Sequence, residues 1–220
     1  ERNEKGDEPI EGWTFVTSNV QPLSSDGFEL RIMSMDNDQT YFEIKSAQLD
    51  IFVPKLSNHW TIEMWIKIEQ YGNKMGTVYH DSGNNGDVRV DVLSDGRVSC
   101  SVVSKDLTKI TTAEVLETVS KYRLSVHTWS HFACVLNEKT MKIYVNGGKL
   151  DFSESTNTML GSVDTIGGNA PIFGCVTTSC DETPFTGQLD DVRIWKRSRT
   201  REEVIKTISP EEPVSSFPLF

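Results

Sequence analysis

The stretch Trp60-Thr-Ile-Glu-Met-Trp-Ile-Lys-Ile68 decides the fold class of this 220-residue chain. Apolar residues at positions 62, 64, 66 and 68 alternate with Glu63, Trp65 and Lys67. A period of two is the pattern of a β-strand that turns one face to a core and the other to solvent. The run Val88-Arg-Val-Asp-Val92 alternates in the same way, so both stretches predict half-buried strands.

Similar runs rich in Val, Ile, Thr and aromatic residues recur along the chain, between clusters of Gly, Asn, Asp and Ser. They occupy residues 28–33, 41–44, 49–53, 76–80 and 97–103. Ser94-Asp-Gly96 and Asn146-Gly-Gly148 have the composition of hairpin turns, in which Gly or Asn takes a positive φ. Residues 113–119 fit a helix as well, but the Thr and Val residues of this region favour extended structure.

One short helix is predicted near the C-terminus. Thr200-Arg-Glu-Glu203 matches a capping box, in which the Thr hydroxyl and the Glu carboxylate each satisfy an otherwise unbonded amide. The helix is expected over residues 201–207, and Pro210 and Pro213 follow it. Many short strands with one small helix predict an all-β jelly-roll sandwich of two antiparallel sheets.

Length and composition predict one domain. Residues 1–12 are charged and lack an apolar period, so we expect a flexible lead-in, a folded domain over 13–208 and a tail over 209–220. Asp and Glu total 32 against 22 Lys and Arg, a formal charge of −10, which argues against nucleic acid as a partner. No apolar run is long enough for membrane insertion, and we expect the chain to be part of a larger modular protein.

The four cysteines predict two disulfides. Cys175 and Cys180 bracket a loop, while Cys100 and Cys134 each lie in a β-patterned run and could face each other across paired strands. Zinc ligation usually shows two close Cys pairs, and only one is present here. The alternative is four reduced thiols in an intracellular protein. Disulfides favour an extracellular or cell-surface location in the secretory pathway.

Three segments carry a family resemblance. They are Trp60–Ile68, then Trp129–Leu136 with Met141–Lys149, then Phe185–Trp195 followed by the short helix. In this order and spacing they resemble the laminin G-like, pentraxin and concanavalin A-like lectin superfamily. The resemblance implies a jelly-roll sandwich with one concave and one convex face, which this superfamily uses mainly to bind glycans or proteins, often with calcium.

The resemblance also suggests where calcium would bind. In laminin G-like domains an aspartate just before a strand can ligate the ion, and Asp87 has that position, with Asp164 near the place of its usual partner. A second arrangement would use Asp190 on the convex side, with help from residues 36–38. Calcium needs six to eight oxygen ligands, usually from loops.

The expected function is an extracellular binding or adhesion module, calcium-assisted, that recognises a glycan or a protein through loops at the sheet rim. The residues predicted to contact the ligand are His80, Asp81, Asn84, Asn85, Asp87, Asp181 and Glu182. The alternative is a structural or assembly domain that packs against other domains of its parent protein without a ligand of its own.

Catalysis is not expected. The Glu-x-Asp-x-x-Glu string of related β-glucanases is missing, and the four histidines show no triad or metal-ligand spacing. His131 falls in a predicted strand and is interpreted as a packed residue. Tyr71, Tyr79, Tyr122 and Trp13 are the aromatic residues left for stacking on sugars, and the basic cluster from Arg193 to Arg201 is interpreted mainly as residues flanking a strand-to-helix turn.

Overall fold

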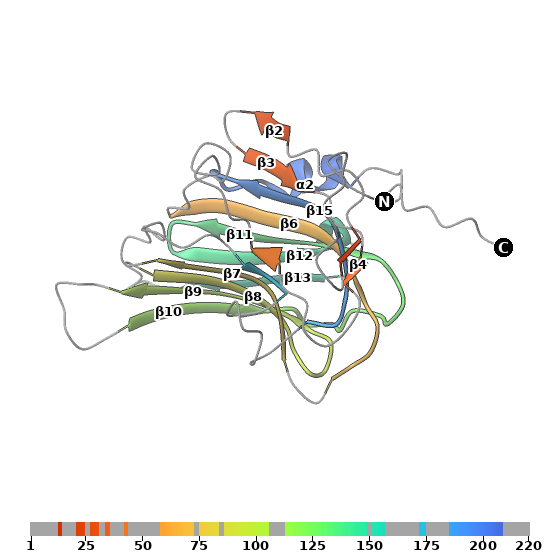
Figure 1. Ribbon diagram of the computed structural model, residues 1–220. Helices are drawn as coiled ribbons and strands as arrows, with labels where there is room; N and C mark the ends of the chain where they lie inside the picture. The colour runs from red at the N-terminus through yellow and green to blue at the C-terminus, as the bar shows by residue number, and fades with distance from the viewer. Residues whose placement is uncertain are drawn as a thin grey trace.

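The protein is a sandwich of two antiparallel sheets (Figure 1). The structure, a computed structural model, describes residues 13–14, 21–24, 27–30, 34–35, 42–43, 58–72, 75–83, 86–105, 113–148, 151–156, 172–174 and 185–208. The predicted strand over residues 49–53 lies outside these ranges. Within them the predicted all-β sandwich with one short C-terminal helix is confirmed.

The first sheet has seven strands in the order β13-β12-β11-β6-β15-β3-β2. Their bounds are β2 Gln21–Ser24, β3 Gly27–Leu30, β6 His59–Ile68, β11 Ser130–Asn137, β12 Thr140–Val145, β13 Asp151–Thr156 and β15 Gly187–Trp195. The 3₁₀ turn η1, Asn146–Gly148, joins β12 to β13, where a hairpin turn is predicted.

The second sheet has six strands in the order β10-β9-β8-β7-β14-β5. Their bounds are β5 Phe42–Glu43, β7 Gly76–Gly83, β8 Gly86–Val92, β9 Val98–Lys105, β10 Ala113–Val119 and β14 Ile172–Phe173. A separate pair consists of β1, Trp13–Thr14, and β4, Ser34–Met35. The ambiguous stretch 113–119 is therefore a strand.

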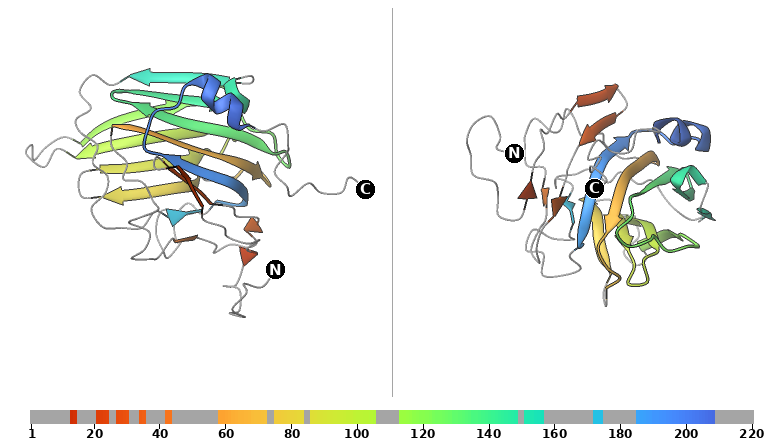
Figure 2. Two further views of the ribbon diagram at one scale, coloured as in Figure 1. Left: turned by 90° about the horizontal axis from the view of Figure 1, so that it is seen from above. Right: turned by 90° about the vertical axis from the view of Figure 1, so that its right-hand side faces the viewer.

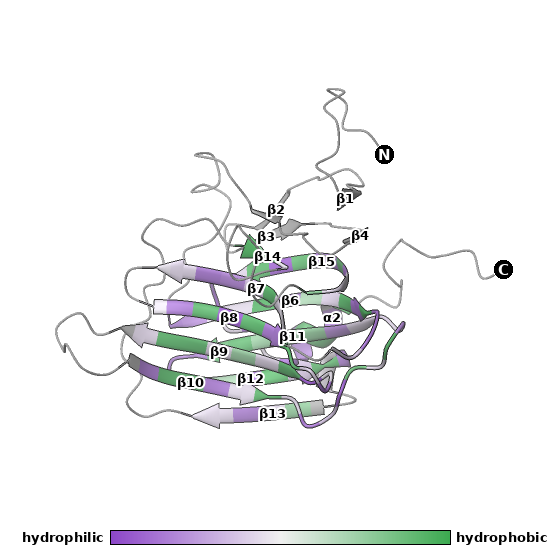
Figure 3. Cartoon of the chain, turned by 60° about the horizontal axis from the view of Figure 1, so that its bottom comes forward, coloured by the Kyte–Doolittle hydropathy of each residue, from purple (hydrophilic) through white to green (hydrophobic). Residues whose placement is uncertain are grey.

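The core lies between the two sheets and follows the alternation seen in the sequence. In β6 the even-numbered residues from Trp60 to Ile68 are buried in the main cluster, together with Val88, Val90 and Val92 of β8. Figure 3 shows alternating hydrophilic and hydrophobic bands along β8 and β10. In β6 and β8, every second side chain is thus an apolar one that faces the core.

A disulfide joins the two sheets in the middle of the core. It pairs Cys100 of β9 with Cys134 of β11, with a Cα–Cα distance of 6.2 Å. The two strands belong to different sheets, so the bond crosses the sandwich. The sequence suggested instead that the two cysteines would face each other across paired strands. The other two cysteines, Cys175 and Cys180, lie outside the described residues.

The helix α2, Arg201–Thr207, covers the outer face of the seven-stranded sheet (Figure 2). Val204 of α2 packs in a second apolar cluster with Ala133, Val135 and Tyr144 of β11 and β12. The predicted capping box is present, with Thr200 accepting from the Glu203 amide and the Glu203 carboxylate accepting from the Thr200 amide. Sequence and structure agree on this helix residue by residue.

Candidate functional site

Four polar residues form a row across the outer face of the six-stranded sheet. They are direct Cα partners on four adjacent strands, since His80 of β7 pairs with Arg89 of β8, Arg89 with Ser101 of β9, and Ser101 with Glu117 of β10. Directly paired residues have side chains on the same face of a sheet. We call the set His80, Arg89, Ser101 and Glu117 the polar row.

The disulfide identifies which face the polar row occupies. Cys100 points into the sandwich toward Cys134, so its neighbour Ser101 points outward. Glu117 is exposed and the other three residues of the row are partly exposed. The row is therefore a band of hydrogen-bonding groups that solvent reaches.

Arg89 is held in place by its neighbours on the same face. Its Nε donates to Asp91 Oδ1 at 2.7 Å, and its Nη2 donates to Thr77 Oγ1 at 2.9 Å. Thr77 in turn donates to Asp91 Oδ1 at 2.7 Å. Because these contacts fix the guanidinium before any ligand arrives, less side-chain entropy would be lost on binding.

Asp91 is unusual for a carboxylate on an outer sheet face because it is only 4% exposed. Burial raises the pKa of Asp91 and outweighs the hydrogen bonds from Arg89 and Thr77, which lower it. Of the groups that favour the ionised carboxylate, Arg89 contributes most, so the two residues act as one charged unit. At the end of the row, the Ser99 hydroxyl donates to Glu117 Oε1 at 2.6 Å and orients that carboxylate in the same way.

The predicted ligand loop contains the β7–β8 hairpin, of which the structure describes both arms. His80 belongs to the polar row, and Asp87 lies two pairs further along, opposite Ser82 and Val103. Asp81 instead points into the sandwich, where it is 2% exposed and lies 3.5 Å from the Tyr79 hydroxyl. The predicted site residues Asn84, Asn85, Asp164, Asp181 and Glu182 lie outside the described residues.

The described carboxylates do not complete a calcium site by themselves. Asp81 and Asp87 are close enough for the charge of Asp87 to raise the pKa of Asp81, but calcium takes six to eight oxygens. In the described ranges no group of three or more His, Cys, Asp or Glu residues is arranged to hold a metal. Calcium therefore stays a prediction from the sequence.

Asp190, the predicted ligand on the other side, lies in β15 of the seven-stranded sheet. Its Oδ1 accepts the Asp191 amide at 2.8 Å at an irregularity in the β15–β6 pairing. Asp191 has a positive φ of 52° and forms an ion pair with Arg193. The local role of Asp190 is thus to stabilise this bulge.

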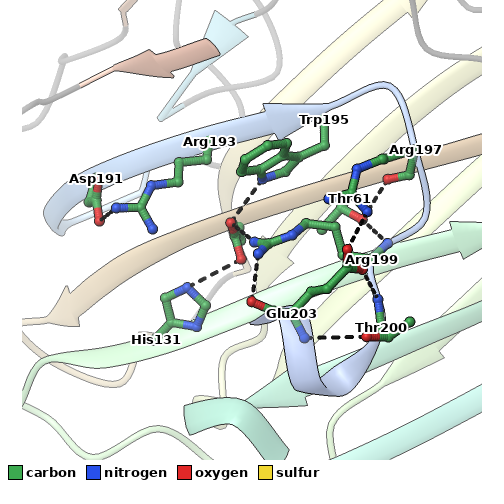
Figure 4. A network of polar contacts seen from close by, with 10 residues as sticks. Thr61, His131, Asp191, Arg193, Trp195, Arg197, Arg199, Thr200 and Glu203 are labelled. Atoms are coloured by element: carbon green, nitrogen blue, oxygen red, sulfur yellow. Dashed lines mark hydrogen bonds and ion pairs between the residues drawn. The ribbon is translucent and has the colours of Figure 1, made fainter. Parts of the chain in front are cut away.

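The basic cluster before α2 is paired with acids and carbonyls (Figure 4). Arg199 binds Glu63, Arg197 binds Glu203 at 2.7 Å, and Arg201 Nε donates to the Gly147 carbonyl at 3.2 Å. Trp195 Nε1 also donates to Glu63 Oε1 at 2.8 Å. These contacts confirm that the cluster attaches the strand-to-helix connection to the sheet.

His131 lies near Arg193 and Arg199 (Figure 4), with its Nε2 3.7 Å from Glu63 Oε2, and the side chains of His131 and Glu63 are essentially inaccessible to solvent. Burial, followed by the charges of Arg193 and Arg199, lowers the pKa of His131 to about 3. The imidazole is therefore neutral at physiological pH, and its ring packs edge-on against Trp65 at 5.5 Å between centroids. His131 is a packed residue, as interpreted from the sequence.

Sequence reasoning missed most of the polar row. The sequence pattern does not single out Arg89, Ser101 or Glu117, although Arg89 and Ser101 alternate with buried apolar residues and Glu117 follows the buried Leu116. The alternation indicates that a residue faces outward, but only the strand order and register place the three beside one another. Of the aromatic candidates, Tyr79 is fully buried, while Tyr71 and Tyr122 are exposed.

Comparisons with known proteins agree with the observed architecture. A profile of the Concanavalin A-like lectin/glucanases superfamily matches residues 36–205. The CBM40 domain of the Ruminococcus gnavus IT-sialidase, solved with α2,3-sialyllactose, is 12% identical, with a TM-score of 0.59, and the match covers 81% of this chain and 95% of that one. No curated protein matches the sequence.

Two further solved structures share the fold. Domain 4 of AbnA, a GH43 extracellular arabinanase from Geobacillus stearothermophilus, solved with arabinotriose, is 22% identical with a TM-score of 0.52, covering 70% of this chain and 69% of that one. NanB sialidase from Streptococcus pneumoniae is 18% identical with a TM-score of 0.58, covering 77% of this chain and 26% of that one. At these identities the likeness shows the fold and not the ligand.

Proposed function

Because this chain belongs to the Concanavalin A-like lectin/glucanases superfamily, we propose that it is a carbohydrate-binding module whose ligand lies across the polar row. The observation that carries the proposal is the alignment of His80, Arg89, Ser101 and Glu117 on four adjacent strands of one sheet face. Neighbouring strands lie about 4.8 Å apart, so the row extends roughly 14 Å. That length suits an extended oligosaccharide.

The chemistry of the row suits sugar hydroxyls. A hydroxyl both donates and accepts hydrogen bonds, and the row offers a guanidinium donor at Arg89, a carboxylate acceptor at Glu117 and a hydroxyl at Ser101 that can do either. Arg89 and Glu117 are held by neighbouring side chains. Fixed donors and acceptors on a rigid sheet favour recognition, because little of the binding energy goes into ordering the site.

The relatives support this class of ligand. The CBM40 domain and AbnA domain 4 were each solved with an oligosaccharide, and NanB is a much longer sialidase that contains the matched fold. The inter-sheet disulfide is consistent with an extracellular or cell-surface location. None of the helices in the described part of the chain is long and apolar enough to cross a bilayer.

The test is a glycan array followed by titration calorimetry on the wild type and on Ser101→Trp. The substitution puts a large side chain in the middle of the row without removing a charged partner, and we expect at least about a tenfold loss of affinity, or about 1.4 kcal/mol. The matched control is Thr156→Trp, at an exposed position of β13 in the other sheet.

Equal affinity of Ser101→Trp and the wild type would remove the polar row as the binding surface. An array without any bound glycan would favour the structural or assembly role instead. In that case a stable complex with a neighbouring domain of the parent protein is the expected finding.

A further inference from the structure

We infer a second ligand site, for an acidic oligosaccharide, at the end of the sandwich opposite to the β7–β8 hairpin. This tyrosine rim consists of Tyr71, Asp95, Gly96, Lys121, Tyr122 and Arg123, from the loops that follow β6, β8 and β10. The register places them at one end, since Gly76 pairs with Val92 and Val119 with Ser99, next to these loops. The inference goes beyond the proposed function because the polar row takes no part in it.

Two aromatic rings of the rim are exposed. Tyr71 is 41% and Tyr122 is 64% exposed, and they are half of the large exposed hydrophobic residues found within the described ranges. A ligand that covers these rings would remove apolar surface from water, which favours binding. A tyrosine ring presents a flat apolar surface and a hydroxyl, which match the apolar face and the hydroxyls of a pyranose.

The rim is rigid, which an exposed loop need not be. Tyr71 donates its hydroxyl hydrogen to the Leu124 carbonyl at 2.8 Å, and the Leu124 amide donates to the Gly96 carbonyl at 2.8 Å. Ser120 donates to the Tyr122 carbonyl at 2.8 Å. The three loops are thus tied together, and the Tyr71 ring and the Tyr122 backbone are held in position before a ligand arrives.

Gly96 makes this arrangement of the rings feasible. Its φ is +85°, and a Cβ added there would lie 2.3 Å from Cε1 of Tyr71. Only glycine allows both the left-handed backbone and the close approach of the ring. Gly96, in the turn after β8, is therefore also the residue against which the Tyr71 ring packs.

Positive charge accompanies the rings. The Arg123 guanidinium lies 5.7 Å from the centre of the Tyr71 ring, and Lys121, Arg123 and Arg97 occupy the same loops as Asp95 and Glu69. Arg97 is paired with Asp95 at 2.7 Å. The described parts of the three loops thus carry three cations and two carboxylates, on a chain whose formal charge is −10. A ligand that brings a carboxylate or sulfate with a sugar ring complements this local reversal of charge.

The contrast with the basic cluster before α2 supports the assignment. There Arg193, Arg197 and Arg199 are each paired with a carboxylate and attached to the sheet. At the rim, Arg97 is likewise paired with Asp95, whereas the side chains of Lys121, Tyr122 and Arg123 are exposed. Of the two basic regions, the rim is the one that combines exposed cations with two exposed tyrosine rings.

The experiment is titration calorimetry with three probes: an oligogalacturonate, a heparin oligosaccharide and a neutral cello-oligosaccharide. We expect the wild type to bind at least one acidic probe, and the neutral one at least tenfold more weakly. Binding of the oligogalacturonate would show that carboxylates on the ligand are sufficient. Binding of the heparin oligosaccharide alone would indicate that sulfates are required. Failure of both acidic probes, or equal binding of the neutral one, overturns the inference.

Variants separate a binding role from a structural one. Tyr122→Ala should weaken the acidic probe about three- to tenfold, since an aromatic contact is worth about 0.5–1.5 kcal/mol, and Tyr122→Phe should restore most of it. Arg123→Glu should weaken binding further at low salt than at high salt. The matched controls are Val115→Ala and Lys196→Glu, both at exposed positions elsewhere.

Two results distinguish this inference from the proposed function. Ser101→Trp should leave binding of the acidic probe unchanged, because the polar row is on the sheet face and the rim is at the sheet end. Unchanged affinity in Tyr122→Ala, with a melting curve like that of the wild type, would refute the rim even if the polar row binds a neutral glycan.

Discussion

Asp81 links the stability of the protein to pH. Burial, partly offset by the Tyr79 hydrogen bond and reinforced by the charge of Asp87, raises the pKa of Asp81 from 3.8 to about 7. The folded protein therefore keeps a proton on Asp81 that the unfolded chain releases near pH 4. Between these two values the folded state binds more protons, so its free energy of unfolding falls as the pH rises.

We predict that Asp81→Asn removes this dependence. The amide stays neutral, so at pH 8 the variant should be more stable than the wild type, by an amount on the order of a few kcal/mol. The difference should shrink toward pH 4, where the wild-type carboxyl is protonated in both states. Urea unfolding from pH 4 to 8 in a chelator measures it, and parallel stability curves for the two proteins would contradict the assignment.

Asp87 carries the calcium prediction. A cation bound by the folded state alone raises stability by about 2.7 kcal/mol at 100 times its Kd, or several degrees in Tm. We predict a higher Tm in calcium than in excess chelator, and no such difference in Asp87→Asn. A wild-type Tm that is the same in calcium and in chelator would contradict the predicted calcium site.

At the scale of elements, the capping box decides where α2 begins. Thr200→Ala removes the acceptor of the Glu203 amide and should lower the free energy of unfolding by about 1 kcal/mol. Lys206→Ala, at an exposed position in the last turn of the same helix, is the control. Chemical denaturation measures both variants. Equal stability of the two would mean that Arg199 and Val204, and not the cap, hold this segment.

Elements with a local cause were predictable from the sequence. Thr200 and Glu203 specify the helix start through contacts three residues apart, and the alternation in β6 and β8 specifies which residues are buried. The polar row and the inter-sheet disulfide were not predicted in this form. Both depend on which strands are neighbours or face each other, and strand order arises from long-range packing that residue spacing does not encode.

The tyrosine rim was also only partly predictable. Tyr71, Tyr79 and Tyr122 are equal candidates in the sequence. Tyr79 is buried in the core because it pairs with Val90, whose side chain faces the core. The tie between Tyr71 and Leu124 joins residues 53 positions apart. The exposure of the Tyr71 and Tyr122 rings therefore depends on how the three loops pack together, which residue spacing does not encode.

For the whole molecule, the disulfide between Cys100 and Cys134 is the single covalent tie between the layers among the described residues. It closes a loop with a sequence separation of 34, for which the chain-entropy estimate is about 4 kcal/mol. We predict that Cys100→Ala with Cys134→Ala loses about that much unfolding free energy in urea. A loss below about 1 kcal/mol would show that packing alone holds the layers together.

The helix α2 distinguishes the two outer faces of the sandwich, and we call the face that it packs on the back and the face with the polar row the front. It lies against β11 and β12 of one layer, while the polar row is on the opposite surface. A linker fused just after residue 208 would start from the back. A chip or bead coupled there would display the front to a passing sugar, whereas random coupling through lysines would hide it on some of the molecules. Orientation of the immobilised protein is thus a variable that any surface-based search for its ligand should control.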